Sequence, residues 1–343
     1  MALIPTTILT GFLGAGKTTL LNRILREPHG RKIAVIENEF GQENIDNEIL
    51  VQDSNEQIVE MSNGCVCCTV RGDLILALSA LAQKRDAGEL HFDRVVIETT
   101  GLANPGPVAQ TFFMDDEVAS HYLLDAVVTL VDAKHAMQQL DEHEEAQRQV
   151  GFADKLLLSK TDLVDAKEVE TLVARLTRIN PRASLGKADF GKTPISEVLD
   201  LRGFNLNDKL EIDPDFLAAE EHEHHECDEH CAHDHAHDHH RPHHSDDISA
   251  FVFKSDRPFD VARLDEFLSG LVQVFGPRML RYKGVLWMQG GERKVIFQGV
   301  HQMMGSDLGA KWAEGEARGS KIVFIGKNLP QETFIRGLEQ CLV

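Results

Sequence analysis

The sequence predicts an α/β fold with a mostly parallel sheet, followed by a smaller α+β domain. Apolar runs typical of strands buried on both faces alternate with helix-like segments up to about residue 200. The composition then becomes strongly polar, and strand and helix patterns return from Ile248. A chain of 343 residues exceeds one average domain. We expect an α/β domain over 1–215, a flexible linker over 216–246 and an α+β domain over 247–343.

Composition excludes several classes of protein. The formal net charge of −20 argues against a nucleic-acid partner, because phosphate backbones require a basic surface. No apolar run reaches the roughly 18 residues of a membrane span, and the first residues lack the basic region of a signal peptide. The 6 cysteines suit metal or redox chemistry in a reducing compartment better than a disulfide framework. We expect a cytoplasmic protein with neither nucleic-acid nor membrane partners.

A glycine-rich loop follows the first strand-like run. It reads G-x-x-x-x-G-K-T from Gly11 to Thr18, between apolar Ile8-Leu9 and a helix-like segment. The glycines let backbone N–H groups turn toward phosphate oxygens, Lys17 adds a positive charge at the β- and γ-phosphates, and the Thr18 hydroxyl can bind Mg²⁺. The strand–loop–helix context disfavours an ordinary glycine turn. The expected nucleotide-binding residues here are Gly11, Gly14, Ala15, Gly16, Lys17, Thr18 and Thr19.

Acidic residues follow two further buried strands. The run 32–36 leads into Glu37 and an acidic stretch through Asp46, at the place where ligands bind in open α/β sheets. A solvated acidic loop is the alternative interpretation of that stretch. The second run, 94–98, ends in Glu98, with Gly101 three positions later. This spacing is typical of the second acidic element of a nucleoside triphosphatase, which holds Mg²⁺ and senses the γ-phosphate. Lys17, Thr18 and Glu98 are therefore the expected catalytic residues.

Three cysteines lie close together at Cys65, Cys67 and Cys68. Thiolates so near one another can supply most of a tetrahedral Zn²⁺ shell, and they favour Zn²⁺ or a similar metal over Mg²⁺ or Ca²⁺. A regular strand would point Cys67 and Cys68 to opposite faces, so a shared metal requires a turn, which Asn63-Gly64 can form. Buried cysteines acting as small hydrophobes, or a redox pair, are the alternatives.

The tetrapeptide Ser159-Lys160-Thr161-Asp162 ends another strand-like run. Asp162 can accept hydrogen bonds from guanine N1 and N2, while the Lys160 stem packs over the base. Adenine lacks that pair of donors, so the site would reject it. The alternative is that Asp162 caps a helix over 164–179, and one carboxylate can do both.

The last part of the chain has two patterns. Residues 220–244 are dense in imidazoles, carboxylates and two thiols, a composition that favours capture of divalent metals over a merely solubilising spacer. From Ile248, strand-like runs beside two helical patterns predict an α+β sandwich, with a ferredoxin-like arrangement as one candidate. Arg281–Gly284 and Trp287 form either a partner surface or part of the core, and packing is the favoured interpretation.

The segments GFLGAGKTTLLN, ENEFG, NGCVCC, ETTGLANP and SKTD, in this order, resemble the CobW-like metallochaperone GTPases of the YjiA-type branch. These are related to the urease and hydrogenase nickel-accessory GTPases. The resemblance implies a P-loop GTPase domain with a C-x-C-C metal motif, a CobW-type C-terminal domain, and slow GTP hydrolysis coupled to loading or release of a transition metal. It also implies that Cys65, Cys67, Cys68 and Glu37 bind metal and that Asp46 lies on the Mg²⁺ side.

Two positions depart from the family pattern. Ser159 stands where relatives usually have Asn or Thr, and Gln42 stands where relatives often have Glu. The expected activity is GTP hydrolysis with GTP, Mg²⁺ and Zn²⁺ bound, and transfer of the metal to a client metalloprotein. Co²⁺ delivery for a cobalamin pathway, metal storage with incidental GTPase activity, and a P-loop kinase or ATPase remain alternatives. A homo-oligomer that depends on metal or nucleotide also stays open.

Overall fold

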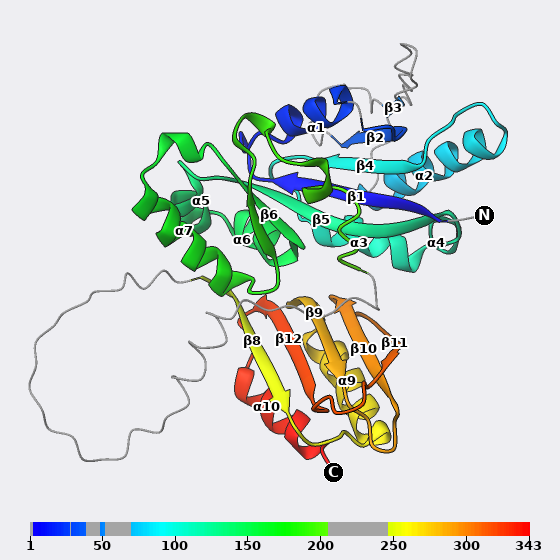
Figure 1. Ribbon diagram of the computed structural model, residues 1–343, viewed down its shortest axis with the longest axis vertical. Coiled ribbons are helices and arrows are strands. Elements are labelled where there is room, and N and C mark those ends of the chain that lie inside the picture. Colours follow the sequence, from blue (N-terminus) through cyan, green and yellow to red (C-terminus); the bar gives the residue numbers. More distant parts are fainter. Residues whose placement is uncertain (1–2, 28, 39–48, 52–69, 205–245) are drawn as a thin grey trace, which may run out of the picture.

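The computed structural model describes residues 3–27, 29–38, 49–51, 70–204 and 246–343 (Figure 1). Its larger sheet has seven strands in the order β3-β2-β4-β1-β5-β6-β7. Six of them run parallel, and the short edge strand β3 pairs antiparallel with β2. The prediction of a mostly parallel sheet is confirmed. The strands are β1 (Ile4–Gly11), β2 (Ile33–Asn38), β3 (Ile49–Val51), β4 (Arg94–Thr99), β5 (Tyr122–Asp132), β6 (Lys155–Ser159) and β7 (Ser184–Lys187).

Apolar side chains alternate between the two faces of this sheet, so both faces are covered. Val35 and Val96 face a core that includes Leu20 and Leu21 of α1, whereas Ile36 and Ile97 face the helices on the other side. Figure 1 shows α1 on one side of the sheet and α2, α3 and α6 on the other. The helices are α1 (Lys17–Arg26), α2 (Val70–Asp86), α3 (Pro105–Met114), α4 (Asp116–His121), α5 (Ala136–Glu142), α6 (Glu144–Phe152) and α7 (Ala166–Ile179).

The smaller sheet is antiparallel, with five strands in the order β11-β10-β9-β12-β8. The ferredoxin-like arrangement is wrong, because four strands separate α9 from α10 where that fold has two. The sequence pattern missed β11, which contains two glycines and an exposed Leu308, so its apolar periodicity is weak. The elements are β8 (Ile248–Ser255), α9 (Val261–Phe275), β9 (Met279–Leu286), β10 (Arg293–Val300), β11 (Met303–Lys311), β12 (Ser320–Lys327) and α10 (Gln331–Gln340).

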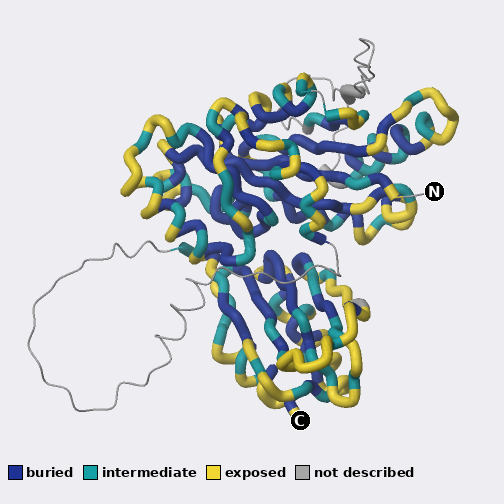
Figure 2. The backbone as a smooth tube through the Cα atoms, in the orientation of Figure 1, coloured by how far each residue is buried: buried dark blue, intermediate teal, exposed yellow. Residues whose placement is uncertain are grey.

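The smaller sheet packs between two layers of helices. One face, which carries Phe251 and Phe324, packs on α9 and α10. The other face carries Val252, Leu280 and Val323, which join the same apolar cluster as the helices below the larger sheet. The tube view shows these buried segments meeting where the two sheets approach each other (Figure 2). The two halves of the chain therefore share one core.

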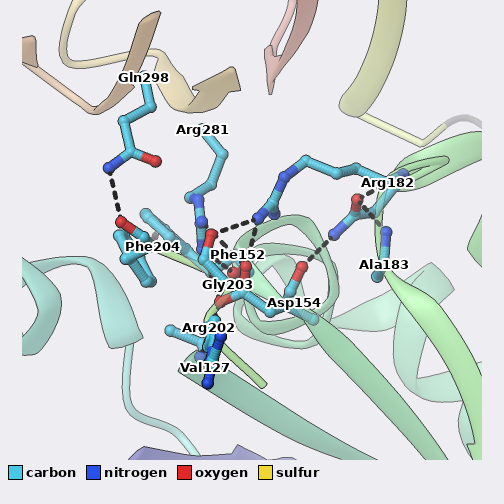
Figure 3. A network of polar contacts seen from close by, with 12 residues as sticks. Val127, Phe152, Asp154, Arg182, Ala183, Arg202, Gly203, Phe204, Arg281 and Gln298 are labelled. Carbon is cyan, nitrogen blue, oxygen red and sulfur yellow. Dashed lines mark hydrogen bonds and ion pairs between the residues drawn. The ribbon is translucent and has the colours of Figure 1, made fainter. Parts of the chain in front are cut away.

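Polar groups fasten the two halves at the buried contact drawn in Figure 3. Arg281 on β9 bonds both carboxylate oxygens of Asp154, at 3.0 and 3.1 Å, and its guanidinium lies 3.9 Å from the Phe204 ring centroid. Arg182 pairs with the same carboxylate. Burial would raise the pKa of Asp154, but the charges of Arg281 and Arg182 hold the pKa below its ordinary value. Packing, not a partner surface, is therefore the role of Arg281.

The expected domain limits stay predictions. The larger sheet lies within residues 4–187 and the smaller sheet within 248–327. Residues 205–245, which include nearly all of the expected linker, lie outside the described residues. In the part of the chain that the structure describes, no helix is long and apolar enough to cross a membrane.

Candidate functional site

The carboxyl ends of the parallel strands gather the expected site residues along one edge of the larger sheet. Gly11 ends β1, Glu37 lies near the end of β2, Glu98 near the end of β4 and Ser159 ends β6. Strands β1 and β4 are direct neighbours, and β5 separates β1 from β6. Because parallel strands share their carboxyl edge, four distant segments meet at one place.

The phosphate loop depends on glycine at two positions. Gly11 has φ 142°, and a Cβ atom there would lie 2.4 Å from the Leu130 carbonyl oxygen on β5. Gly16 has φ 95° and is the N-cap of α1, so it places the first N–H groups of that helix at the loop. Between them Gly14 is exposed and Ala15 is buried, and the Ala15 N–H donates to the Phe12 carbonyl at 3.2 Å. The loop thus has the geometry expected of an anion site at a helix N-terminus, and its binding of phosphate stays a prediction.

Lys17 begins α1 and turns back over this loop. Its Nζ donates to the Gly11 carbonyl at 2.8 Å and to the Phe12 carbonyl at 3.3 Å. Burial lowers the pKa of Lys17, and the nearby Glu98 carboxylate partly offsets that effect. The Lys17 ammonium is thus held at the loop, where its positive charge would stabilise a bound triphosphate.

Thr18 and Glu98 contact each other, as the magnesium prediction requires. The Thr18 hydroxyl donates to Glu98 Oε1 at 2.9 Å, and the Glu98 side chain is 9% exposed. Hydroxyl and carboxylate oxygens are the hard ligands that Mg²⁺ prefers. The donor set therefore fits Mg²⁺ next to the phosphate loop. Thr19, the next residue of α1, is exposed.

Glu37 lies beside Glu98 in the sheet. The two are register partners on β2 and β4, and the alternation places both on the α1 side. The carboxylate expected to bind the transported metal is therefore next to the carboxylate expected on the Mg²⁺ side. Asp46, Cys65, Cys67 and Cys68 lie outside the described residues. Within the described ranges, no group of three or more His, Cys, Asp or Glu side chains could hold a metal.

A buried carboxylate organises the predicted base site. Asp132 ends β5 and is 2% exposed, and its Oδ2 lies 2.6 Å from Lys160 Nζ and 2.9 Å from His135 Nδ1. Burial would raise the pKa of Asp132, but the hydrogen bonds from Lys160 and His135 and the charge of Lys160 hold it below its ordinary value. The ion pair fixes the position of the Lys160 side chain at the carboxyl end of β5. The sequence did not reveal this role of Asp132. The only signal for it was an acidic residue at the end of a buried strand.

Asp162 is exposed in a short 3-10 turn (Thr161–Leu163) and is not a helix cap. Asp165 caps α7 instead, in a reciprocal capping box with Glu168. The cap interpretation of Asp162 is therefore wrong, and helix α7 begins at Ala166. Asp189, which sequence reasoning also missed, fixes the turn by accepting from the Thr161 N–H at 2.7 Å and from its hydroxyl at 2.5 Å.

Ser159 joins the predicted base and phosphate sites. Its hydroxyl donates to the Ala15 carbonyl at 2.7 Å, inside the phosphate loop. The departure from the family pattern at this position therefore keeps a hydrogen bond that a shorter or apolar side chain would lose. The residues expected to hold the base and the triphosphate are connected directly.

The comparisons with known proteins agree with this arrangement. Residues 5–186 match the model of the CobW/HypB/UreG nucleotide-binding domain, and residues 248–342 match the CobW C-terminal domain. The chain is 41% identical to the zinc chaperone YjiA of Escherichia coli, covering 96% of both chains. It is 35% identical to the zinc chaperone CobW of Pseudomonas aeruginosa, covering 100% of this chain and 92% of the relative. A solved structure of Zn(II)-bound YjiA GTPase from E. coli superposes with a TM-score of 0.77 at 37% identity, covering both chains fully.

Proposed function

Because the chain belongs to the CobW/HypB/UreG family of nucleotide-binding proteins and carries a CobW C-terminal domain, we propose that it is a GTP-hydrolysing zinc chaperone. In this function the protein binds GTP and a divalent transition metal and passes the metal to a client metalloprotein. The relatives named as zinc chaperones, and the Zn(II)-bound GTPase structure, support zinc as the metal. Cobalt is the alternative metal.

The observation that carries the proposal is the register of β2 and β4. Glu37 and Glu98 are direct partners, and Glu98 accepts a hydrogen bond from Thr18 in the first turn of α1. A movement of Glu98 when nucleotide binds would therefore occur directly beside Glu37, a ligand proposed for the transported metal. The proposed thiolate ligands of the transported metal are Cys65, Cys67 and Cys68. We also propose that Asp46 lies on the Mg²⁺ side of the site.

The residues of the phosphate loop are suited to phosphoryl transfer. The α1 N-terminus and the Lys17 ammonium would stabilise the charge that spreads over the transferred phosphoryl group. Thr18 and Glu98 would hold Mg²⁺, which neutralises charge on the β- and γ-phosphate oxygens when bound. Lys160 and Asp162 would select guanine, with Lys160 held by Asp132. Lys17 and the Thr18–Glu98 pair would therefore have separate tasks, charge stabilisation and Mg²⁺ binding.

Metal analysis of the purified chain, combined with GTPase assays in Zn²⁺, Co²⁺ and Ni²⁺, tests the proposal. We expect at least one equivalent of tightly bound zinc per chain. We also expect hydrolysis of GTP that added ATP does not inhibit. A preparation in which cobalt displaces zinc at equal concentration would favour the cobalt alternative. Hydrolysis of ATP as fast as GTP would contradict the proposal.

Deleting residues 220–244, which lie outside the described residues, separates a chaperone from a storage protein. A chaperone keeps one tight site at the proposed thiolates and keeps metal-dependent GTP hydrolysis. A storage protein loses most of its bound metal with the histidine-rich stretch. Competition against a chelator of known affinity measures both the number and the strength of the remaining sites.

A further inference from the structure

A glutamine on α6 holds the loop that follows Glu98. The Gln149 carboxamide donates from Nε2 to the carbonyl oxygens of Gly101 and Ala103, both at 3.0 Å, and the residue is 1% exposed. Its backbone is fixed as well, because the Gln149 carbonyl accepts from the Thr129 hydroxyl of β5 at 2.9 Å. The family resemblance assigned no role to this residue. A buried donor with two acceptors defines where the loop backbone lies.

The loop is confined from the opposite side by the phosphate loop. A Cβ atom on Gly101 would lie 2.6 Å from Leu13 Cδ2 and 2.7 Å from the Leu13 backbone nitrogen. Gly101 therefore lies between the triphosphate-binding loop and the Gln149 side chain. Losing the carboxamide would remove the donor to the buried Gly101 carbonyl and to the partly buried Ala103 carbonyl, which destabilises this loop position.

The C-terminal end of α6, two residues after Gln149, packs on the C-terminal sheet. A Cβ atom on Gly151 would lie 2.8 Å from Leu280 Cδ1 and 3.3 Å from Ile248 Cγ2, so helix and sheet approach closely. The Phe152 carbonyl accepts from Arg281 at 3.0 Å, a contact visible in Figure 3. Only a few residues of one helix thus separate the loop at Gly101 from the C-terminal domain.

A second contact joins the same loop to the same domain. Gly106, in the first turn of α3, faces His301 in the turn between β10 and β11. A Cβ atom on Gly106 would lie 2.7 Å from His301 Nε2 and 2.7 Å from Phe152 Cζ. The Phe152 and His301 rings themselves meet edge to face, with centroids 5.2 Å apart. One end of the loop 101–106 is therefore held by α6, a helix that packs on the C-terminal sheet, and the other end contacts His301 of that domain.

We propose that Gln149 is a positioning residue for GTP hydrolysis, and that α6 and the turn at His301 transmit the state of the 101–106 loop to the C-terminal domain. This rests on the proposed GTPase function and on the expectation that the acidic element at Glu98, with the loop that follows it, senses the γ-phosphate. With GTP bound, the loop is held in one position by the phosphate loop and Gln149. Release of the γ-phosphate changes that position, and the displacement reaches the C-terminal sheet through Gly151, Phe152 and His301.

The variant Gln149→Leu tests the first part, with Gln147→Leu as its matched control. Gln147 is on the same helix and is 6% exposed. Its carboxamide donates to the Leu140 carbonyl at 2.8 Å and accepts from the Ile248 N–H at 3.2 Å. The structure shows no hydrogen bond from Gln147 to the 101–106 loop. We expect Gln149→Leu to lower kcat for GTP hydrolysis about tenfold, the loss of one net hydrogen bond of about 1.4 kcal/mol. In this variant the affinity for a non-hydrolysable GTP analogue should fall relative to the affinity for GDP. The Kd for GDP itself should change less than about twofold.

Hydrogen exchange of the wild-type chain tests the second part. Exchange rates at the turn 300–303 and in β9 should differ between the GDP and GTP-analogue complexes, and Gln149→Leu should abolish that difference. Equal kcat and equal nucleotide preference in Gln149→Leu and wild type, or the same kcat loss in Gln147→Leu, would overturn the proposal. A wild-type chain that does not hydrolyse GTP would instead contradict the proposed function, so the two failures are distinguishable.

Discussion

Asp132 organises the base site from a position that is almost completely buried. It holds Lys160 and His135 through one oxygen, while its other oxygen accepts from the Lys134 N–H at 3.0 Å. A carboxylate held charged by such partners keeps the lysine stem in place before any ligand arrives. The sequence could predict Lys160 and Asp162 from one tetrapeptide, but it could not predict Asp132 or Asp189. Lys160 lies 28 residues after Asp132 and Thr161 lies 28 residues before Asp189, and only the fold brings each pair together.

Asp162→Asn should relax the choice of base. We expect the Kd for GTP to rise about 10- to 100-fold, because a charged acceptor of two hydrogen bonds is lost. Asp165→Asn is the matched control, since Asp165 caps α7 three residues away. The control should leave the ratio of GTP to ATP affinity unchanged, measured by competition binding, because Asn also caps helices well. A GTP to ATP ratio unchanged in Asp162→Asn would contradict the assignment.

The phosphate loop and α6 are the two elements on which the site depends most. The loop could be predicted in full because its glycine spacing is local and its strand–loop–helix context is visible in the sequence. The role of α6 could not, because Gln149 and Gly151 act on partners about 50 residues before and about 130 residues after them. The apolar pattern of α6 predicts only a core-facing helix. The strand β11 was missed for a different reason, because its glycines and the exposed Leu308 weaken its apolar periodicity.

Gly11→Ala should damage the phosphate loop more than Gly14→Ala. A Cβ atom on Gly11 meets the Leu130 carbonyl oxygen at 2.4 Å, whereas at Gly14 no atom lies within 4 Å. Both positions have positive φ, so both variants carry a strain of about 1 kcal/mol. Only Gly11→Ala must also move the backbone of β1 or β5. Urea unfolding should therefore show a larger loss of stability for Gly11→Ala, and comparable losses would contradict this account.

The molecule as a whole has two sheets but one shared core. Consecutive apolar residues along β8 and β12 indicate that both faces of the smaller sheet are covered, yet the sequence does not say what covers the second face. The structure shows that the helices of the larger sheet do so, with Arg281 and Asp154 at a buried ion pair. The motifs thus predicted the architecture of each half, and the contact between the halves required the tertiary structure.

Arg281→Leu should destabilise the whole chain. Removing one partner of a buried pair typically costs about 3–5 kcal/mol, and here Arg182 remains beside Asp154, which favours the lower end of that range. Arg336→Ala is the control, because its pair with Glu332 is exposed and should contribute less than about 1 kcal/mol. Chemical unfolding should remain a single transition for the wild type. Two separate transitions would show that the halves fold independently.

The contact at His301 should weaken in acid. Burial lowers the pKa of His301 below its ordinary value of 6.5, so the folded protein holds the neutral imidazole while the unfolded chain takes up a proton. The stability that depends on this is fully present above pH 6.5 and is lost as the pH falls toward the folded pKa. Asn tolerates the positive φ of 52° at this position, so His301→Asn removes the titration without added strain.

Thermal unfolding from pH 7.5 to 5 compares the two proteins. Wild type should lose stability faster than His301→Asn by up to about 1.4 kcal/mol per pH unit, the limit for one proton. All other histidines are common to both proteins, so the difference between the curves isolates this one. Parallel curves would show that His301 takes up no proton on unfolding in this range.

The central claim is that binding of the nucleotide and binding of the transported metal are coupled through the Glu37–Glu98 pair. Titrating Zn²⁺ with and without a non-hydrolysable GTP analogue measures it directly. We predict that the Kd for Zn²⁺ changes about 5- to 150-fold between the two states, and that Zn²⁺ changes the Kd of the analogue by the same factor. Glu37→Gln should reduce both changes together. Equal Zn²⁺ affinities with and without the analogue would contradict the account.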